Sequence, residues 1–97
     1  MESRINDNTL VFHFTERLDT LAAMGLQKEI TATVDAALPS CAVRFDFAGV
    51  KYISSGFLRI VMIVVRMKSG NFSIINAGPA VRRILEMAGL DKWIAVP

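Results

Sequence analysis

Two adjacent serines, Ser54 and Ser55, are the residues whose position in this sequence could support chemistry. They follow an alternating segment and a glycine, and they precede an apolar run with helical spacing. The first turn of a helix has backbone N–H groups without intrahelical partners, and the helix dipole favours negative charge there. A serine at this position can cap the helix, bind a phosphate or become phosphorylated. The residues alone favour the simple cap.

The other polar residues do not form a catalytic or metal-binding pattern. His13 is the only histidine and stands in an alternating segment, so we interpret it as a solvated side chain. No sequence-evident base accompanies either serine, so a hydrolase triad is not expected. Asp19, Asp35 and Glu86 form no evident pair for acid–base catalysis. Asp46 could orient the serines, but a surface or turn carboxylate is the simpler interpretation. We therefore expect no catalysis, no metal and no cofactor.

Size, charge and cysteine content limit the classes of function. The 97 residues allow one domain, 1–97, and the composition of 53% hydrophobic and 21% charged residues is globular. A net charge of +2 gives no electrostatic reason to expect nucleic-acid binding. The single cysteine, Cys41, rules out an internal disulfide and fits a reducing cytosol. The N-terminus has no apolar signal segment, and the apolar stretch 57–67 is shorter than the about 20 residues that span a bilayer. These features predict a cytoplasmic protein without direct membrane insertion.

Hydrophobic spacing predicts alternating strands and helices. The expected strands are 9–14, 42–47, 72–76 and 93–96. Apolar residues three and four apart predict three helices, over 21–38, from the serine pair to about 67, and over 79–88. Residues 5–8 can form a short N-terminal edge strand that pairs antiparallel, and 49–53 are expected to form a loop.

This element order predicts an α/β fold with a mostly parallel sheet, because helices between strands make right-handed crossovers. Strands that are covered on both faces read as continuous apolar runs. Here Arg44 and Asp46 alternate with apolar residues, and His13 does the same in the first main strand. We therefore expect a one-sided sheet, with the helices packed on one face and the other face open to water.

Two segments resemble a known family. They are 45–59, which contains the serine pair, and 76–90, with the sequence Asn-Ala-Gly-Pro-Ala-Val-Arg-Arg-Ile-Leu-Glu-Met-Ala-Gly-Leu. Together with Arg17-Leu18-Asp19-Thr20, they resemble a STAS domain of the bacterial anti-sigma factor antagonist type. The resemblance implies a one-sided sheet with stacked β-α units. It also implies binding to a serine kinase that doubles as an anti-sigma factor, phosphorylation of one serine at the start of the second helix, and reversal by a phosphatase.

The resemblance leaves two candidates for the phosphorylated serine. Aligned without a gap, the phosphoserine of the family falls on Ser55; aligned on Ser-Ser-Gly, it falls on Ser54. The family usually has a small residue and then glycine after the serine, whereas here Gly56 comes one position early and Phe57 takes its place. The partner-binding residues that we expect are Asp19, Ser54, Ser55, Gly56, Phe57, Ile60 and Val64.

The second predicted helix is apolar on almost all sides. We expect Leu58, Val61, Met62 and Val65 to face the core. Phe57, Ile60 and Val64 are then expected to form a partner-facing patch beside the serines. Contact with neighbouring helices or with a second copy of the chain is the alternative, and the sequence does not determine the oligomeric state.

Three functional hypotheses follow. The first is an antagonist that binds a kinase-type anti-sigma factor and is released by phosphorylation. The second is a constitutive STAS interaction module, such as a subunit bound to a transport ATPase, in which the serine only caps a helix. The third is a small-ligand or nucleotide-binding domain.

Overall fold

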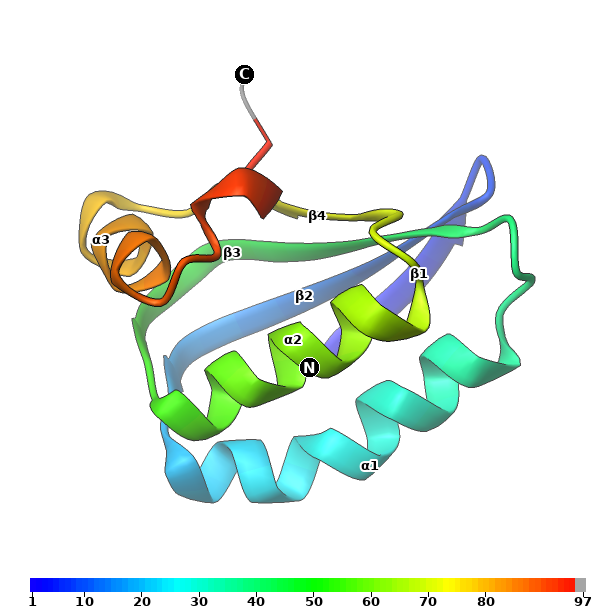
Figure 1. Cartoon of the computed structure of the whole chain (residues 1–97). Helices are drawn as coiled ribbons and strands as arrows, with labels where there is room; N and C mark the ends of the chain where they lie inside the picture. The colour runs from blue at the N-terminus through cyan, green and yellow to red at the C-terminus, as the bar shows by residue number, and fades with distance from the viewer. Residues whose placement is uncertain (96–97) are drawn as a thin grey trace.

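Alternating apolar residues build a four-stranded mixed sheet in the computed structural model, which describes residues 1–95. The elements follow one another as β1 (Glu2–Asn6), β2 (Thr9–Leu18), α1 (Thr20–Ala36), β3 (Ala42–Ile53), α2 (Ser55–Met67), β4 (Phe72–Ile75), α3 (Pro79–Met87) and the 3₁₀ turn η1 (Asp91–Trp93) (Figure 1). The strand order is β1-β2-β3-β4, with β1 antiparallel to β2 and the other neighbours parallel. The predicted α/β class, the parallel sheet and the antiparallel edge strand are confirmed.

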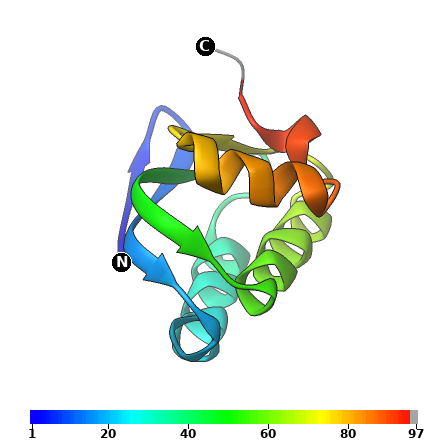
Figure 2. The same cartoon turned by 90° about the vertical axis from the view of Figure 1, so that its left-hand side faces the viewer.

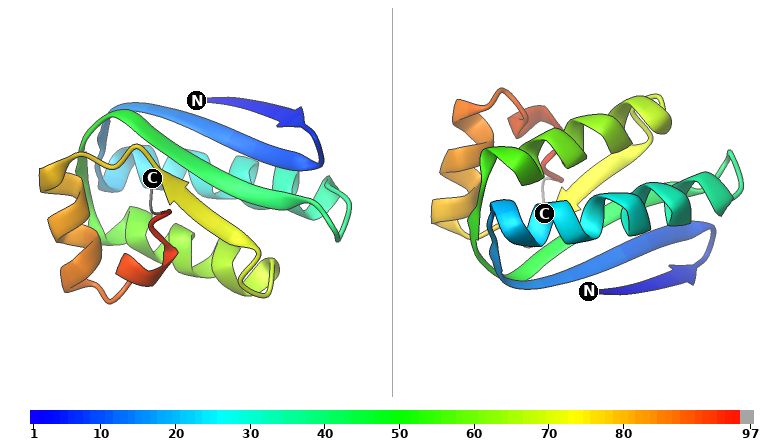
Figure 3. Two further views of the ribbon diagram at one scale, coloured as in Figure 1. Left: turned by 90° about the horizontal axis from the view of Figure 1, so that it is seen from above. Right: turned by 90° about the horizontal axis from the view of Figure 1, so that it is seen from below.

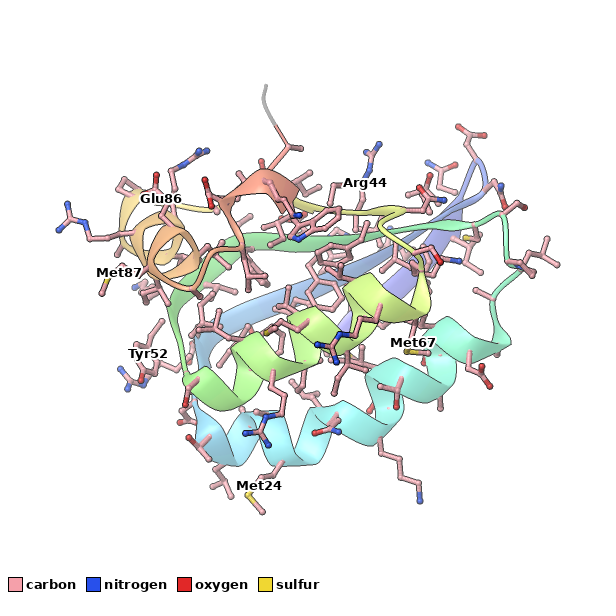
Figure 4. The ribbon with its side chains drawn as sticks, viewed as in Figure 1. Met24, Arg44, Tyr52, Met67, Glu86 and Met87 are labelled. Carbon is pink, nitrogen blue, oxygen red and sulfur yellow. The ribbon has the colours of Figure 1, made fainter. Side chains whose placement is uncertain are left out.

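The sheet is covered by helices on one face. Helices α1 and α2 lie side by side beneath the strands, as the two views of Figure 3 show. Helix α3 lies at the end of the sheet, beside the extension of β3. The opposite face carries half-exposed and polar residues, and Figure 4 shows Arg44 pointing away from α1 and α2. The predicted one-sided sheet is therefore confirmed.

Six phenylalanines form the centre of the core. Ring centroids lie 4.9 Å apart for Phe14 and Phe45, 5.0 Å for Phe45 and Phe72, and 5.1 Å for Phe14 and Phe57, all edge to face. Phe12 and Phe47 complete this phenylalanine cluster. Since Phe57 comes from α2 and the others from three strands, the cluster fixes the start of α2 against the sheet.

Some segments differ from the predictions. The edge strand expected at 5–8 covers Glu2–Asn6, with residues 7–8 in the turn, and β2 runs to Leu18 beyond the expected end at residue 14. The loop expected at 49–53 continues β3, because it pairs with the end of β2 from Gly49 opposite Thr15 to Ile53 opposite Leu18. One shift of register lies just before this stretch and one within it. The strand expected at 93–96 is wrong: η1 ends at Trp93, and Ile94 makes a single parallel bridge to Ile74. Val96 lies outside the described residues.

The C-terminal turn is held by a close contact with a glycine. Gly70, in the turn after α2, has a φ of +84°, and a Cβ there would lie 3.2 Å from the ring of Trp93. Glycine therefore suits this position both by its conformation and by the space available. The contact brings η1 against the C-terminal end of α2.

The predicted partner-facing patch of α2 is wrong. Phe57, Ile60 and Val64 have no exposed surface and belong to the core. These residues lie on one stripe of the helix. This stripe faces the sheet, where Phe57 packs within the phenylalanine cluster. Of the residues expected to face the core, only Val61 is fully buried, whereas Met62 is 44% exposed.

Candidate functional site

The ends of β2 and β3 place two helix N-termini side by side. Leu18 and Ile53 are paired neighbours at the carboxyl ends of these parallel strands, and a helix begins shortly after each. The N–H of Ser54 donates to the carbonyl oxygen of Leu18 at 2.8 Å, which ties the start of α2 to the end of β2. Figure 2 shows the two strands leading into α1 and α2 at this end of the molecule.

Ser54 is the N-cap of α2. Its backbone is extended, with φ −85° and ψ 166°, and its Oγ accepts a hydrogen bond from the N–H of Phe57 at 3.2 Å. The residue is only 4% exposed. Its hydroxyl is therefore enclosed and used to satisfy one of the free N–H groups of the helix.

Ser55 is the first residue of α2, and it is exposed. It lies where two shallow grooves meet. One groove, of about 310 Å³, is formed with α1 and is lined by Thr20, Ala23, Met24, Gln27, Gly56 and Arg59. The other, of about 510 Å³, runs along α2 and is lined by Leu58, Arg59, Met62, Ile63 and Arg66. Of the two serine hydroxyls, that of Ser55 is open to an approaching protein.

Asp19 and Gly56 belong to the same end of the molecule. Asp19 caps α1, with its Oδ1 accepting from the N–H of Ala22 at 2.9 Å. An added Cβ at Gly56 would lie 3.5 Å from the Cβ of Ala23, so the starts of the two helices are in close contact. The structure thus brings together Asp19, Ser54, Ser55 and Gly56, whereas it places Phe57, Ile60 and Val64 beneath this surface.

Several exposed residues at this end were missed by the sequence reasoning. The guanidinium of Arg17 lies 4.7 Å from the centroid of the Tyr52 ring, within cation–π range. Leu21 and Met24 of α1 are 79% and 74% exposed, and Figure 4 shows Met24 and Tyr52 pointing outward. Arg59 could have been identified from the sequence as a neighbour of Ser55, because residues four positions apart share a helix face.

Known proteins resemble this chain in sequence pattern and in fold. The family model of the STAS domain matches residues 1–97. This chain belongs to the STAS domain family. No curated protein sequence matches it.

Solved structures of anti-sigma factor antagonists have the fold of this STAS domain. The unphosphorylated form of the anti-sigma factor antagonist SpoIIAA has a TM-score of 0.83 at 18% identity, over 97% of this chain and 84% of the other. The phosphorylated form of SpoIIAA from Bacillus has a TM-score of 0.73 at 17% identity, over 97% and 87%. An anti-sigma factor antagonist from Mycobacterium paratuberculosis has a TM-score of 0.82 at 27% identity, over 96% and 80%.

A polar cluster on the open face of the STAS domain holds Asp46. Its Oδ2 lies 3.0 Å from Nδ1 of His13, and its Oδ1 accepts from Nδ2 of Asn76 and the N–H of Ala48, each at 3.0 Å. Burial raises the pKa of Asp46, but the hydrogen bonds from Asn76 and Ala48 and the His13 imidazole outweigh burial and hold the pKa below its ordinary value. The Asp46 side chain is only 13% exposed, and both of its oxygens are engaged within this cluster, so Asp46 is a networked carboxylate and not a freely solvated one.

Residues 1–95 of the STAS domain contain neither a metal-binding cluster nor a membrane-spanning helix. No three His, Cys, Asp or Glu side chains in that range lie together in a way that could hold a metal ion. No helix in the same range has the length and hydropathy needed to cross a membrane.

Proposed function

We propose that this STAS domain is a cytoplasmic, anti-sigma factor antagonist-like regulatory protein. It binds a serine kinase that is also an anti-sigma factor, phosphorylation of Ser55 releases it, and a phosphatase restores binding. The observation that carries the proposal is the division between the two serines. Ser54 is enclosed and occupied as the cap, while Ser55 is exposed at the first position of α2.

The position of Ser55 allows a phosphate without loss of the fold. A phosphoserine carries about −1.5 to −2 charges at neutral pH. At the N-terminus of α2 this charge lies near free N–H groups and the positive end of the helix dipole. Arg59, one turn further along the exposed face, is a second favourable neighbour. Modification therefore changes the surface and leaves the packing of Phe57 beneath it intact.

The same charge weakens binding to a partner that covers Ser55. A partner packed over this surface would have to remove water from a doubly charged group, which is unfavourable unless the partner supplies cations. The solved structures of SpoIIAA in unphosphorylated and phosphorylated forms support the proposal, because the same fold accommodates both states in that protein.

The test is incubation of the chain with ATP, Mg²⁺ and the serine kinase encoded nearest to it, followed by intact mass measurement. We expect a gain of about 80 Da, the mass of one phosphate. Ser55→Ala is expected to abolish the gain, and Ser3→Ala, at an exposed serine of β1, is the matched control that keeps it. Unphosphorylated chain is expected to bind the kinase and phosphorylated chain to be released.

Other outcomes select other functions. A gain that survives Ser55→Ala but disappears in Ser54→Ala would move the modified residue to the cap. Stable binding to a transport ATPase without any mass gain would favour the constitutive interaction module, in which the Ser54 cap is the whole role of the serine pair.

A further inference from the structure

The outward side of α2 carries a continuous stripe of exposed residues that starts at Ser55. Arg59, Met62 and Arg66 follow it at intervals of four, three and four residues, so all four side chains lie on one helix face. We call these four residues the α2 outer stripe. With Leu58 and Ile63 they line the groove of about 510 Å³.

The charges of the stripe are unbalanced. Helix α2 contains Arg59 and Arg66 and no acidic residue. Within residues 1–95, no carboxylate lies within ion-pair distance of either arginine. Arg66 is in the last turn, where the helix dipole favours a cation, but Arg59 is outside that turn and gains nothing from it. Among the described residues, Arg59 therefore has neither an ion-pair partner nor a favourable position in the helix dipole.

An apolar surface lies between the two arginines. Met62 is 44% exposed, and Leu58 and Ile63 are partly buried beside it. The arginines are seven residues apart, which corresponds to about 10 Å along the helix axis. Two cations with an apolar centre do not suit a phosphate backbone, which is bound through several cationic contacts. They match an amphipathic helix that has carboxylates at both ends of an apolar stretch.

We propose that the α2 outer stripe is the docking surface for an acidic amphipathic helix of the partner. One carboxylate of that helix pairs with Arg59 and a second, seven residues away, pairs with Arg66, while its apolar side chains cover Met62 and Leu58. The inference rests on the proposed function in that this partner is the one that phosphorylation of Ser55 displaces. A phosphate on Ser55 pairs with Arg59, so Arg59 no longer pairs with the acidic helix, and the phosphate repels the carboxylates of that helix.

The test uses a synthetic helical peptide with two glutamates seven residues apart and leucines between them. A second peptide has lysines in place of the glutamates. Each is titrated into the ¹⁵N-labelled chain. We expect the acidic peptide to shift the amide signals of α2 between Ser55 and Arg66 and the lysine peptide to leave them in place. Raising the salt concentration weakens the effect, because exposed charges are screened.

Charge variants identify the contact. Arg59→Glu and Arg59→Gln are expected to weaken binding of the acidic peptide, the former by about fivefold or more. Arg44→Glu, which reverses an arginine on the open face of the sheet, is the matched control and binds like the wild type. The amide spectrum of each variant reports whether it is folded.

Three results would overturn the docking surface: no shift of the α2 signals with the acidic peptide, equal binding of the lysine peptide, or unchanged binding by Arg59→Glu. No kinase enters this experiment. If phosphorylation fails but the acidic peptide binds, the phosphorylation switch is wrong and the docking surface stands. If phosphorylation succeeds but the acidic peptide does not bind, the docking surface is wrong and the switch stands.

Discussion

Neighbouring serines with the same chemistry occupy different environments because the chain changes conformation between them. Ser54 has extended backbone angles, which turn its Oγ back toward the N–H of Phe57. Ser55 already belongs to the helix, and its side chain lies on the outer surface. One residue has a role in stability and the next is available for recognition, so substitutions separate the two roles.

Removal of the cap is expected to cost stability. Ser54→Ala loses the hydrogen bond to the N–H of Phe57 and leaves that buried group unsatisfied, at a cost of about 1 to 2 kcal/mol in the free energy of unfolding. Ser55→Ala, on the surface, is expected to stay within about 0.5 kcal/mol of the wild type. Urea denaturation measures both. A larger loss for Ser55→Ala would show that the cap has been assigned to the wrong serine.

The Asp46 cluster predicts a specific dependence of stability on pH. A carboxyl whose pKa is lowered by folding stabilises the folded state while it is ionised. This contribution is complete above the ordinary pKa of about 4 and is lost as the pH falls through the lower folded value. We expect the Tm of the wild type to fall more steeply than that of Asp46→Asn between about pH 5 and pH 3.

Thermal melts at several pH values check this expectation. Glu29→Gln, at an exposed carboxylate of α1, is the matched control and should follow the wild type. Parallel profiles for the wild type and Asp46→Asn would contradict a stabilising role of the cluster.

The serine pair could be found from the sequence, but the division between its members could not. The spacing of apolar residues predicted a helix that starts at these serines. Which serine becomes the cap depends on where β3 ends, and 49–53 were expected to be a loop. The pairing of this segment with β2 is irregular, with shifts of register near Thr15 and Arg17. A register of that kind has no signal in the alternation of apolar residues.

At the level of elements, α2 shows why an apolar helix is difficult to orient from its sequence. Two stripes, one with Phe57, Val61 and Val64 and one with Leu58, Met62 and Val65, are both apolar enough to face a core. The positions of the two arginines indicate the orientation of α2. Arg59 and Arg66 share one face, so the buried side had to lie opposite them, and Phe57 and Val64 are found there.

Substitutions along α2 are expected to follow this orientation. Ile60→Ala should lower the free energy of unfolding by about 2 to 5 kcal/mol, because it leaves a cavity in the core. Ile60→Val, which removes one methylene, should cost about 0.5 to 1.5 kcal/mol and keeps the comparison readable if the larger change prevents folding. Met62→Ala should change stability by less than about 0.5 kcal/mol.

Urea denaturation of the three variants gives the comparison. If Met62→Ala cost as much as Ile60→Ala, the helix would be rotated relative to the structure, and the α2 outer stripe would lose its basis.

At the scale of the whole molecule, stability is distributed unevenly over the sheet. Strands β2 and β3 are central, and both bury alternate residues in the core. All residues of β1 are exposed, and β1 pairs only with β2. Alternation in the sequence was enough to predict the one-sided sheet. Alternation could not predict that the expected last strand would instead be a 3₁₀ turn, because a short apolar run has the same pattern in both.

Hydrogen exchange is expected to show this gradient. Amides of β2 and β3 that pair within the core should exchange slowest, near the rate set by global unfolding, whereas those of β1 should exchange through local fraying. Measurement by NMR or mass spectrometry after transfer to D₂O resolves the strands. Equal protection of β1 and β3 would mean that the edge strand opens only with the rest of the molecule.

The contact between Trp93 and Gly70 has a spectroscopic consequence. The chain has one tryptophan and one tyrosine, and they lie at different ends of α2. We therefore expect indole fluorescence excited near its red edge to report on the C-terminal turn rather than on events at Ser55. Tyr52, whose ring centroid lies 4.7 Å from the Arg17 guanidinium, is three residues before Ser55. Ultraviolet difference absorption of tyrosine is therefore the label-free signal that we expect to follow partner docking at this end of α2.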